Sequence, residues 1–301
     1  TDYGIDATGH TDCTEAVQKL INHVGQYGSG YKNTTAGVFN QSAGATIYFP
    51  AGTYLFRGQL TLPRGVTLRG DWRKPEGKIE GTIFRIEPAT TGSNATSDAF
   101  ISMAVASMVQ GINFWYPGQN ASQPVAMGPT IHMGVQGYRG CNFPQVRCCT
   151  FVNSYDAIIT DQEGNCPNDF QIYGTPLHTG IYMDNIVDVG RIDGVRFSPQ
   201  IWAESGLAGA PSLSEVQSWT RNNAVGIVMR RSDWSYTTNY TCDHYHTAFQ
   251  TRMSVIENNR VPGLPNNANY NFTISDCERG LDIVESAAYG EQFTRMNITG
   301  C

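Results

Sequence analysis

Two aspartates, Asp161 and Asp184, are the residues of this sequence best placed for acid–base chemistry. Each ends one of two similar segments, CTFVNSYDAIITD at 149–161 and IYGTPLHTGIYMD at 172–184, which are offset by 23 residues. If the segments are successive coils of a solenoid, matched residues lie about 4.8 Å apart on adjacent strands. Alternation along the strands would then turn both carboxylates outward, at the separation that retaining glycosidases use for acid and nucleophile. Repulsion between like charges would also raise the pKa of one of them, as a general acid requires.

Other roles for this pair stay open. Both aspartates could end strands and cap turns, as Asp often does, or they could share a calcium ion. A third acidic candidate is Asp233 in the run RRSDW, which has cations on one side and Trp234 on the other. No cofactor is predicted, and calcium is the one metal left possible.

Aromatic residues on predicted turns form a second set of candidates. Flat aromatic faces stack on sugar rings through apolar contacts, and His178, one coil above Tyr155, would bind sugar hydroxyls. Packing of loops against the solenoid is the alternative explanation. The candidate substrate-binding residues are Trp115, Tyr116, His178, Tyr182, Trp202 and Trp234.

The elements that would position these residues follow from the repeat. Runs rich in Val, Ile, Phe and Thr recur along the chain, and several steps are close to 23–25 residues. They predict an all-β fold, a single-stranded parallel β-helix in one domain over 1–301, with Ile158 and Ile181 as core neighbours. Its coils occupy 44–301, with a long loop near 199–223 in which 214–221 forms a short helix.

Residues 1–43 are predicted to form an N-terminal cap helix and a loop. Asp12 and Glu15 offer a capping box, and apolar residues then follow helical spacing. A solenoid needs such a plug because an end coil exposes bare core and unpaired backbone. The sequence ends in a predicted strand, so no C-terminal cap is predicted within it. We expect more chain or a neighbouring subunit, in a self-associated form, to cover that end.

Two segments carry a family resemblance: DYGIDATGHTDCTEAVQKLI at 2–21 and GATIYFPAGTYLFRGQLTLPRGVTLRGD at 44–71. They resemble the opening of pectate-lyase-superfamily β-helix proteins, a group that includes glycoside hydrolase family 55, and FWYPGQ, YGTPLHTGIYMD and RSDW resemble later segments. The resemblance implies a right-handed parallel β-helix and a polysaccharide as the usual substrate. It also implies that a two-helix enzyme of family 55 would hold part of its site outside this chain. The polygalacturonase motifs N-T-D, D-D, G-H-G and R-I-K are absent, which disfavours pectin hydrolysis.

Composition suggests where the protein works. Eight cysteines without a Cys-x-x-Cys pair favour disulfides over zinc, and hence a secreted, extracellular protein. Seven Asn-x-Ser/Thr sequons suggest a glycoprotein. They lie at Asn33, Asn40, Asn94, Asn120, Asn239, Asn271 and Asn297.

The net charge of −6 argues against nucleic acid and against an anionic glycan, unless a cation bridges. No apolar run is long enough for a membrane span. The sequence therefore predicts a secreted, glycoside-hydrolase-like β-helix that acts on or binds a neutral polysaccharide such as a β-glucan. The alternative is a non-enzymatic, glycosylated surface or filament subunit, or a glycan-binding module. An open groove holding two carboxylates would distinguish the enzyme from the alternative.

Overall fold

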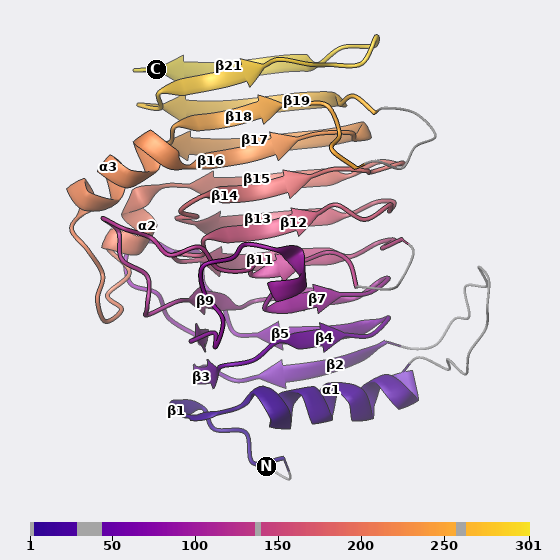
Figure 1. The fold of residues 1–301 in the computed structure, drawn as a ribbon, viewed down its shortest axis with the longest axis vertical. Coiled ribbons are helices and arrows are strands. Elements are labelled where there is room, and N and C mark those ends of the chain that lie inside the picture. Colours follow the sequence, from indigo (N-terminus) through magenta and orange to yellow (C-terminus); the bar gives the residue numbers. More distant parts are fainter. Residues whose placement is uncertain (1–2, 29–43, 136–139, 257–262) are drawn as a thin grey trace.

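The 23-residue offset is the length of one coil. In the computed structural model, β12 (Asp156–Thr160) and β14 (Thr179–Met183) are parallel neighbours, and Ile158 lies opposite Ile181. The structure describes residues 3–28, 44–135, 140–256 and 263–301. Its strands stack as rungs along the long axis, so the predicted parallel β-helix is confirmed (Figure 1).

Two parallel sheets form the walls of the solenoid, and we call them sheet A and sheet B. Sheet A follows the order β1 (Thr8–Asp12), β3 (Gly52–Phe56), β6 (Thr82–Ile86), β9 (Asn113–Trp115), β11 (Gln145–Phe151), β13 (Asn168–Gly174), β15 (Arg191–Phe197), β17 (Asp233–Asp243), β19 (Asn266–Ser275) and β21 (Gln292–Thr299), and β2 (Ala45–Phe49), β5 (Val66–Gly70) and β8 (Met108–Gln110) join it. Sheet B contains β4 (Leu60–Leu62), β7 (Ile101–Met103), β10 (Ile131–His132), β12, β14, β16 (Val225–Met229), β18 (Thr247–Thr251) and β20 (Arg279–Ile283).

The core is built from columns of similar side chains, one from each rung. In sheet B, Ile131, Ile158, Ile181 and Ile227 follow one another in register, and all four are fully buried. β-branched side chains suit such a column because they pack closely against the same residue type one rung away. An outward residue lies between successive core residues along such a strand, so the outward side chains also form columns, polar on some rungs (Ser102, His132) and apolar on others (Ile159).

Sheet A bends where one residue of each long strand adopts a positive φ. These residues share one position in the register, between paired neighbours: Cys148, Gln171, Gly194, Asn239, Asn271 and Arg295. Glycine and asparagine tolerate this conformation best. Asn271 Nδ2 also donates to Asn239 Oδ1 at 2.7 Å, which ties two rungs together at the bend.

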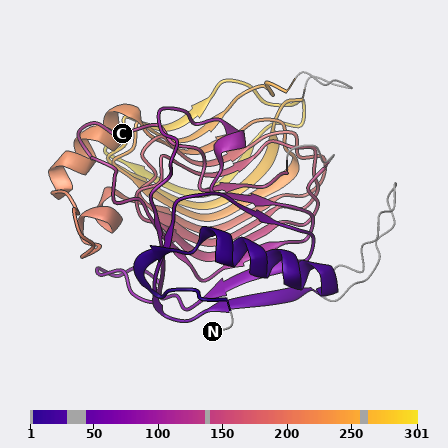
Figure 2. The same ribbon diagram turned by 60° about the horizontal axis from the view of Figure 1, so that its bottom comes forward.

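The N-terminal plug is present as predicted. The amphipathic helix α1 (Thr14–Gly28) lies across the first coil and contacts β2, β4 and β5 (Figure 2). The predicted capping box is only half right, because the helix begins at Thr14 and its backbone N–H donates to the carboxylate of Asp12 at 3.0 Å. At the opposite end β21 is the last rung (Figure 1), and its covering by more chain or a subunit stays a prediction.

The segment 199–223 is more ordered than the predicted loop with one short helix. It forms two helices, α2 (Pro199–Ala203), capped by Ser198, and α3 (Leu213–Asn223), capped by Ser212 with Glu215 in a capping box. Their apolar sides bury Trp202 and Val216 in a cluster outside the main core. A short 3-10 helix, η1 (Thr96–Asp98), lies elsewhere in the chain. Among the described residues, no helix is long and apolar enough to cross a membrane.

All eight cysteines lie in the described ranges, and all eight are free thiols. The expected disulfide framework is therefore not found. Most of these side chains point into the solenoid, where a thiol behaves as a small apolar group. Burial raises the pKa of Cys149 to about 12 and the pKa of Cys141 to about 12, which keeps both protonated.

Candidate functional site

One carboxylate of the predicted pair, Asp161, lies on the outside of sheet B beside a histidine. Asp161 follows β12, and its Oδ1 lies 2.6 Å from Nε2 of His132 in β10, the preceding rung. The imidazole is nearly buried, with 7% of its side chain exposed, whereas 27% of the Asp161 side chain is exposed. The histidine therefore acts as a buried support that orients a carboxylate facing the solvent.

A polar cavity of about 340 Å³ adjoins this pair. Its floor is one outward column of sheet B, in which Thr61, Ser102 and His132 occupy matched positions on three rungs. Rungs lie about 4.8 Å apart, so hydroxyl and imidazole groups recur at that interval. We call this feature the sheet B groove. It is lined by Gln59, Thr61, Thr96, Ser97, Ser102, His132, Val135 and Gln162.

The walls of the sheet B groove are held by side-chain amides. Gln59 Nε2 donates to the carbonyl of Ser97 in η1 at 2.8 Å, which fixes one wall. On the other side, Gln162 exchanges two hydrogen bonds with the backbone of Val135, each 3.3 Å long. Hydroxyl, amide and imidazole groups offer both donors and acceptors, which suits a ligand rich in hydroxyl groups.

The second carboxylate, Asp184, is not in the groove, and its predicted exposure is wrong. Its side chain is buried, and its oxygens accept hydrogen bonds from Asn185 N at 2.7 Å, Val255 N at 3.2 Å and Tyr182 Oη at 3.4 Å. The chain turns directly after β14 through a positive φ at Asn185, and the segment before 257 folds over it. Asp184 thus serves the turn, as the turn-capping alternative expected. Its oxygens are occupied by donors, which speaks against a calcium ion shared with Asp161.

Tyr182 continues the outward column two rungs beyond His132, through Ile159. The guanidinium of Arg230 lies 5.6 Å from the ring centroid of Tyr182. Burial and the nearby carboxylate of Asp184 raise the pKa of Tyr182, so the hydroxyl stays a proton donor. The ring of Tyr182 is half-buried and faces outward, as the alternation predicted, and its role as a sugar contact stays a prediction.

A second histidine–aspartate pair lies at the other end of the sheet B strands. His178 Nδ1 lies 2.7 Å from Asp156 Oδ1, and Asn94 Nδ2 donates to the other carboxylate oxygen at 3.1 Å. His178 also stacks on Tyr155, with 4.9 Å between ring centroids, so the predicted placement of His178 above Tyr155 is confirmed. The hydrogen bond to Asp156 raises the pKa of His178. Here the imidazole is the exposed group.

Three of the predicted sugar-binding aromatics are buried. Trp115 and Trp202 pack in the cluster beneath α2 and α3, and Tyr116 is buried with its hydroxyl 2.8 Å from Thr130 Oγ1. The packing alternative therefore holds for these three: Tyr116 belongs to the main core, and Trp115 and Trp202 belong to the cluster that also contains Val216 of α3. Trp234 differs, since it is 56% exposed and lies 5.5 Å from the ring of Tyr289.

Asp233, beside Trp234, begins β17 and forms an ion pair with Arg231 at 3.3 Å. The described residues contain no group of three or more His, Cys, Asp or Glu side chains that could hold a metal ion.

Of the sequons, Asn33 and Asn40 lie outside the described residues. Asn94, Asn120, Asn239 and Asn297 are exposed and Asn271 is half-buried.

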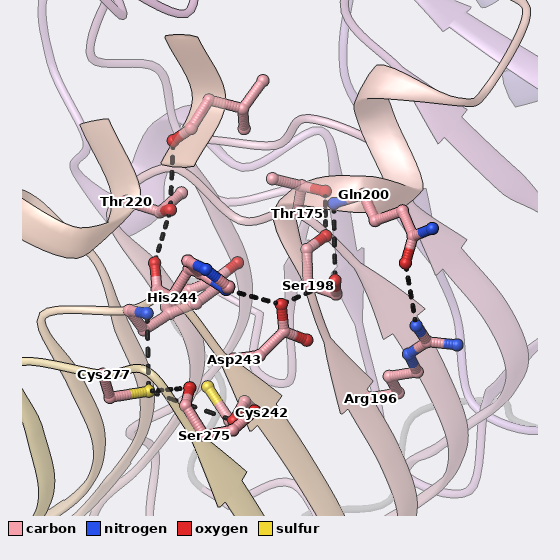
Figure 3. Close-up of polar contacts among 12 residues, drawn as sticks. Thr175, Arg196, Ser198, Gln200, Thr220, Cys242, Asp243, His244, Ser275 and Cys277 are labelled. Carbon is pink, nitrogen blue, oxygen red and sulfur yellow. Dashed lines mark hydrogen bonds and ion pairs between the residues drawn. The ribbon is translucent and has the colours of Figure 1, made fainter. Parts of the chain in front are cut away.

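A serine, an aspartate and a histidine also meet at the end of sheet A, beneath α2 and α3 (Figure 3). Asp243 Oδ2 accepts from Ser198 Oγ at 3.1 Å and lies 3.1 Å from His244 Nδ1. The serine thus contacts the carboxylate and not the imidazole, which differs from the order of contacts in a serine–histidine–aspartate triad. Ser198 caps α2, and Thr220 of α3 donates to the carbonyl of His244, so this cluster anchors the two helices.

His132 and the cavity residues were missed by the sequence analysis. β10 is only two residues long and lies in a stretch without a clear repeat, so its pattern gave no signal. Asp156 and Asn94 lie 62 residues apart. Only the stacking of coils brings them together.

Comparisons with known proteins agree with this architecture. The family model described as rhamnogalacturonase A/epimerase, pectate lyase-like, matches residues 1–244. The tailspike of phage phiAB6, solved with oligosaccharides of Acinetobacter baumannii surface polysaccharide, has a TM-score of 0.61 and 12% identity, and the match covers 99% of this chain and 46% of the tailspike. A tailspike of E. coli bacteriophage HK620, solved with a pentasaccharide, has a TM-score of 0.54 and 14% identity over 97% of this chain and 47% of the tailspike.

This chain spans about half the length of those tailspikes. At such low identities the likeness concerns the fold. No curated protein matches the chain. The predicted pectate-lyase-like resemblance is confirmed by the family model, whereas the resemblance to family 55 stays a prediction.

Proposed function

Since the chain belongs to the rhamnogalacturonase A/epimerase, pectate lyase-like family, we propose that it binds a polysaccharide along the outer face of sheet B. The observation that carries this proposal is the outward column of Thr61, Ser102 and His132 inside a polar cavity. A column with one polar group per rung matches a ligand that repeats its own hydroxyls along a chain. Tyr182 extends the column with an aromatic ring for stacking.

The ligand we propose is a neutral polysaccharide, such as a β-glucan. The net charge of −6 and the carboxylate of Asp161 beside the groove both repel an anionic chain. The residues lining the groove are hydroxyl, amide, imidazole and one apolar side chain. We further propose that the protein is extracellular and carries sugars at exposed sequons such as Asn120 and Asn297.

Cleavage of the bound chain is the second function we propose, and the short contact between His132 and Asp161 favours it. A carboxylate that is oriented by a buried imidazole of the groove and is itself partly exposed can take a proton from a water molecule or a sugar hydroxyl. Asp184 does not supply the second carboxylate of a retaining pair, because its oxygens serve the turn. Binding without turnover is the alternative that this second proposal must exclude.

Binding is tested first by blocking the groove without removing its charged pair. Ser102→Tyr places a ring in the floor of the cavity, and we expect the affinity for a panel of neutral glucans to fall at least tenfold by calorimetry. Thr61→Ala removes one hydroxyl and should lower affinity less, about threefold, which corresponds to part of one hydrogen bond. The matched control is Thr273→Ala, which removes an exposed outward hydroxyl from sheet A.

Two outcomes would contradict the proposed binding site. One is a wild-type protein that binds no member of the panel. The other is Ser102→Tyr binding as tightly as Thr273→Ala. Thermal melts of all variants show whether a loss of binding reflects a loss of fold.

A further inference from the structure

The first coils contain a second cavity beside the sheet B groove. It measures about 210 Å³ and lies where the chain passes from sheet A to sheet B, since Ile86 ends β6 and Phe100 immediately precedes β7. We call this cavity the corner pocket. The residues that line it include Arg57, Ile86, Asp98, Phe100, Tyr116 and Met127.

The corner pocket and the sheet B groove share a wall. Gln59 lines both cavities, and η1 contributes Thr96 and Ser97 to the groove and Asp98 to the pocket. The hydrogen bond from Gln59 to the carbonyl of Ser97 joins the two elements that form this wall. A sugar bound at this end of the groove therefore lies next to the pocket.

Close backbone packing holds the walls of the corner pocket in place. An added Cβ at Gly128 would lie 2.0 Å from the carbonyl oxygen of Asp98, so only glycine allows η1 to approach this closely. The N–H of Gly92 also donates to the carbonyl of Ala126 at 2.7 Å, which ties the segment before η1 to the segment that carries Met127. Two backbone contacts thus connect the walls on either side of the pocket.

The floor of the corner pocket is apolar. Four of its residues are almost fully buried members of the main core: Ile86, Phe100, Tyr116 and Met127. The hydroxyl of Tyr116 is engaged with Thr130 Oγ1, so Tyr116 offers its ring as a contact surface. Such a floor favours a small apolar group, because contact with it removes apolar surface from water.

Two charged residues of the pocket offer one hydrogen-bond donor group and one acceptor group. Arg57 Nη2 lies 3.2 Å from Glu87 Oε2, and Arg85 pairs with the other oxygen of Glu87. Because two guanidinium groups share this carboxylate, Arg57 keeps N–H donors for another acceptor. Asp98 is half-buried, and its carboxylate has no hydrogen bond or ion pair among the described residues. Opposite charges on Arg57 and Asp98 suit an uncharged ligand.

We propose that the corner pocket takes the acetamido group of a sugar bound in the sheet B groove, an inference that rests on the proposed binding function. The methyl of the acetamido group contacts the apolar floor, its carbonyl oxygen accepts from Arg57, and its N–H donates to Asp98. The polysaccharide then contains N-acetylated amino sugars, which are uncharged like the ligand proposed for the groove.

The size and the chemistry of the pocket favour this substituent over others. Ligand pockets usually measure about 300–1,000 Å³, so the corner pocket holds a substituent of one sugar and not a chain. A hydroxyl group would leave the apolar floor in contact with water, and an O-acetyl ester has no N–H for Asp98. A carboxylate substituent would be repelled by Asp98. An acetamido group uses the floor, the donor and the acceptor together.

The test compares the hexasaccharides of chitin and of cellulose. They share one linkage, and chitin carries an acetamido group where cellulose carries a hydroxyl. We expect calorimetry to show about tenfold tighter binding of the chitin hexasaccharide, from one buried methyl group and two hydrogen bonds. The chitosan hexasaccharide carries a charged amine in place of the acetamido group, and at moderate salt it should bind less tightly than the chitin hexasaccharide.

Variants of the pocket should change this preference. Asp98→Ala removes the acceptor and should lower the preference for chitin about fivefold, whereas Asp98→Asn keeps an acceptor oxygen and should retain more of it. Ala89 is an exposed residue of the pocket lining, and Ala89→Trp should fill the pocket and abolish the preference. The matched control is Asp188→Ala, which removes an exposed aspartate between β14 and β15 and should keep the wild-type preference.

The groove variant separates this inference from the proposed function. Ser102→Tyr should weaken binding of both hexasaccharides alike, because it blocks the groove and not the pocket. If the wild type bound both hexasaccharides equally and Ser102→Tyr bound neither, the acetamido pocket would be wrong and the groove would stand. If the wild type bound neither, both proposals would be wrong.

Two further results would contradict the acetamido pocket. One is a preference for chitin in Asp98→Ala and Ala89→Trp as strong as in Asp188→Ala, which would place the selectivity elsewhere. The other is tighter binding of the chitosan hexasaccharide than of the chitin hexasaccharide, which would assign the preference to charge. Thermal melts of every variant show whether a change in binding reflects a loss of fold.

Discussion

The two histidine–aspartate pairs on sheet B contain the same residue types but expose opposite groups. In the pair near the groove, 7% of the His132 side chain and 27% of the Asp161 side chain are exposed. In the pair at the other end of the strands, 45% of His178 and 4% of Asp156 are exposed. The first pair presents a carboxylate to the solvent, and the second presents an imidazole.

The difference arises from where each residue lies relative to its strand. His132 lies inside β10 and Asp161 lies just after β12, so the histidine is held in the sheet and the aspartate is at its edge. In the other pair, Asp156 opens β12 and is covered, while His178 precedes β14 in a turn. Position along a coil, and not residue type, thus decides which partner is available for chemistry.

The largest expected effect separates the two pairs by turnover. If the protein cleaves a polysaccharide, Asp161→Asn should lower the rate of cleavage by about 10²–10⁴-fold, because the amide cannot accept the proton. His178→Gln should leave the rate unchanged, since His178 lies at the other end of the strands. Release of reducing ends from a bound glucan measures both. Equal loss in the two variants, or no turnover by the wild type, would contradict a catalytic role for Asp161.

A third carboxyl group, that of Asp169, sharpens the comparison because it is buried without a partner in the described part of the chain. Asp169 is fully buried in sheet A, and neither of its oxygens has a hydrogen-bond partner among the described residues. Burial alone raises the pKa of Asp169 to about 8. The folded protein therefore keeps this proton up to about pH 8, whereas the unfolded chain loses it near pH 4.

Stability should consequently fall as the pH rises from about 4 to about 8, because the folded state binds more protons than the unfolded state in that range. Asp169→Asn removes the titration, and we expect the free energy of unfolding at pH 8 to rise by about 2–3 kcal/mol, less the cost of an unpaired amide. Urea unfolding at pH 5 and pH 8 measures it. If the free energy of unfolding of Asp169→Asn kept the wild-type slope against pH, another group would dominate that pH dependence. Glu291, whose pKa is raised to about 7 by burial, would be the first group to examine.

The buried carboxylate of the second pair should matter more for stability than the exposed one of the first. Asp156→Ala leaves Asn94 and His178 without their acceptor, and we expect a loss of about 1–3 kcal/mol in the free energy of unfolding. Asp161→Ala should cost less, because solvent reaches its site. Denaturant midpoints of the two variants at one pH give the comparison. A larger loss in Asp161→Ala would reverse the assignment of the supporting and exposed partners.

The sequence predicted the parts of the fold that depend on its repeat. The 23-residue register, the inward isoleucines and α1 follow from spacing alone, since each coil repeats the same local pattern. The exposure of Asp184 was wrong because Val255, 71 residues away, folds over it. The burial of Trp115 and Trp202 was missed for the same reason, since α2 and α3 interrupt the repeat and cover the outside of the coils.

The candidate site shows the same difference between residues in repeating coils and residues in irregular ones. Asp161, Tyr182 and His178 were found because they lie in repeating coils, where position predicts the side that a residue faces. His132 was missed because its short strand lies where the repeat is irregular, and nothing local marks it. Long-range contacts between a regular and an irregular coil therefore set the limit of what spacing can predict.

The smallest expected effect concerns the charge on His178. Its hydrogen bond to Asp156 raises the pKa of His178 above its usual value near 6.5. A raised folded-state pKa means that the protonated imidazole stabilises the fold fully below about pH 6.5. This contribution is lost as the pH rises through the folded-state pKa, so wild-type stability should fall over that range.

Replacing the imidazole tests this step. His178→Gln keeps a hydrogen-bond donor near Asp156 but does not titrate, so the fall in stability that belongs to His178 should disappear while the slope due to Asp169 persists. The measurement is a series of urea midpoints between pH 5.5 and pH 8.5 in the wild type, His178→Gln and Asp156→Asn. Because Asp156→Asn removes the charge that favours the imidazolium, it should lose the same step with the histidine still present. If both variants kept the wild-type dependence of stability on pH, protonation of His178 would not contribute to stability. The exposed imidazole of His178 would then differ from the exposed carboxylate of Asp161 only in its position in the fold.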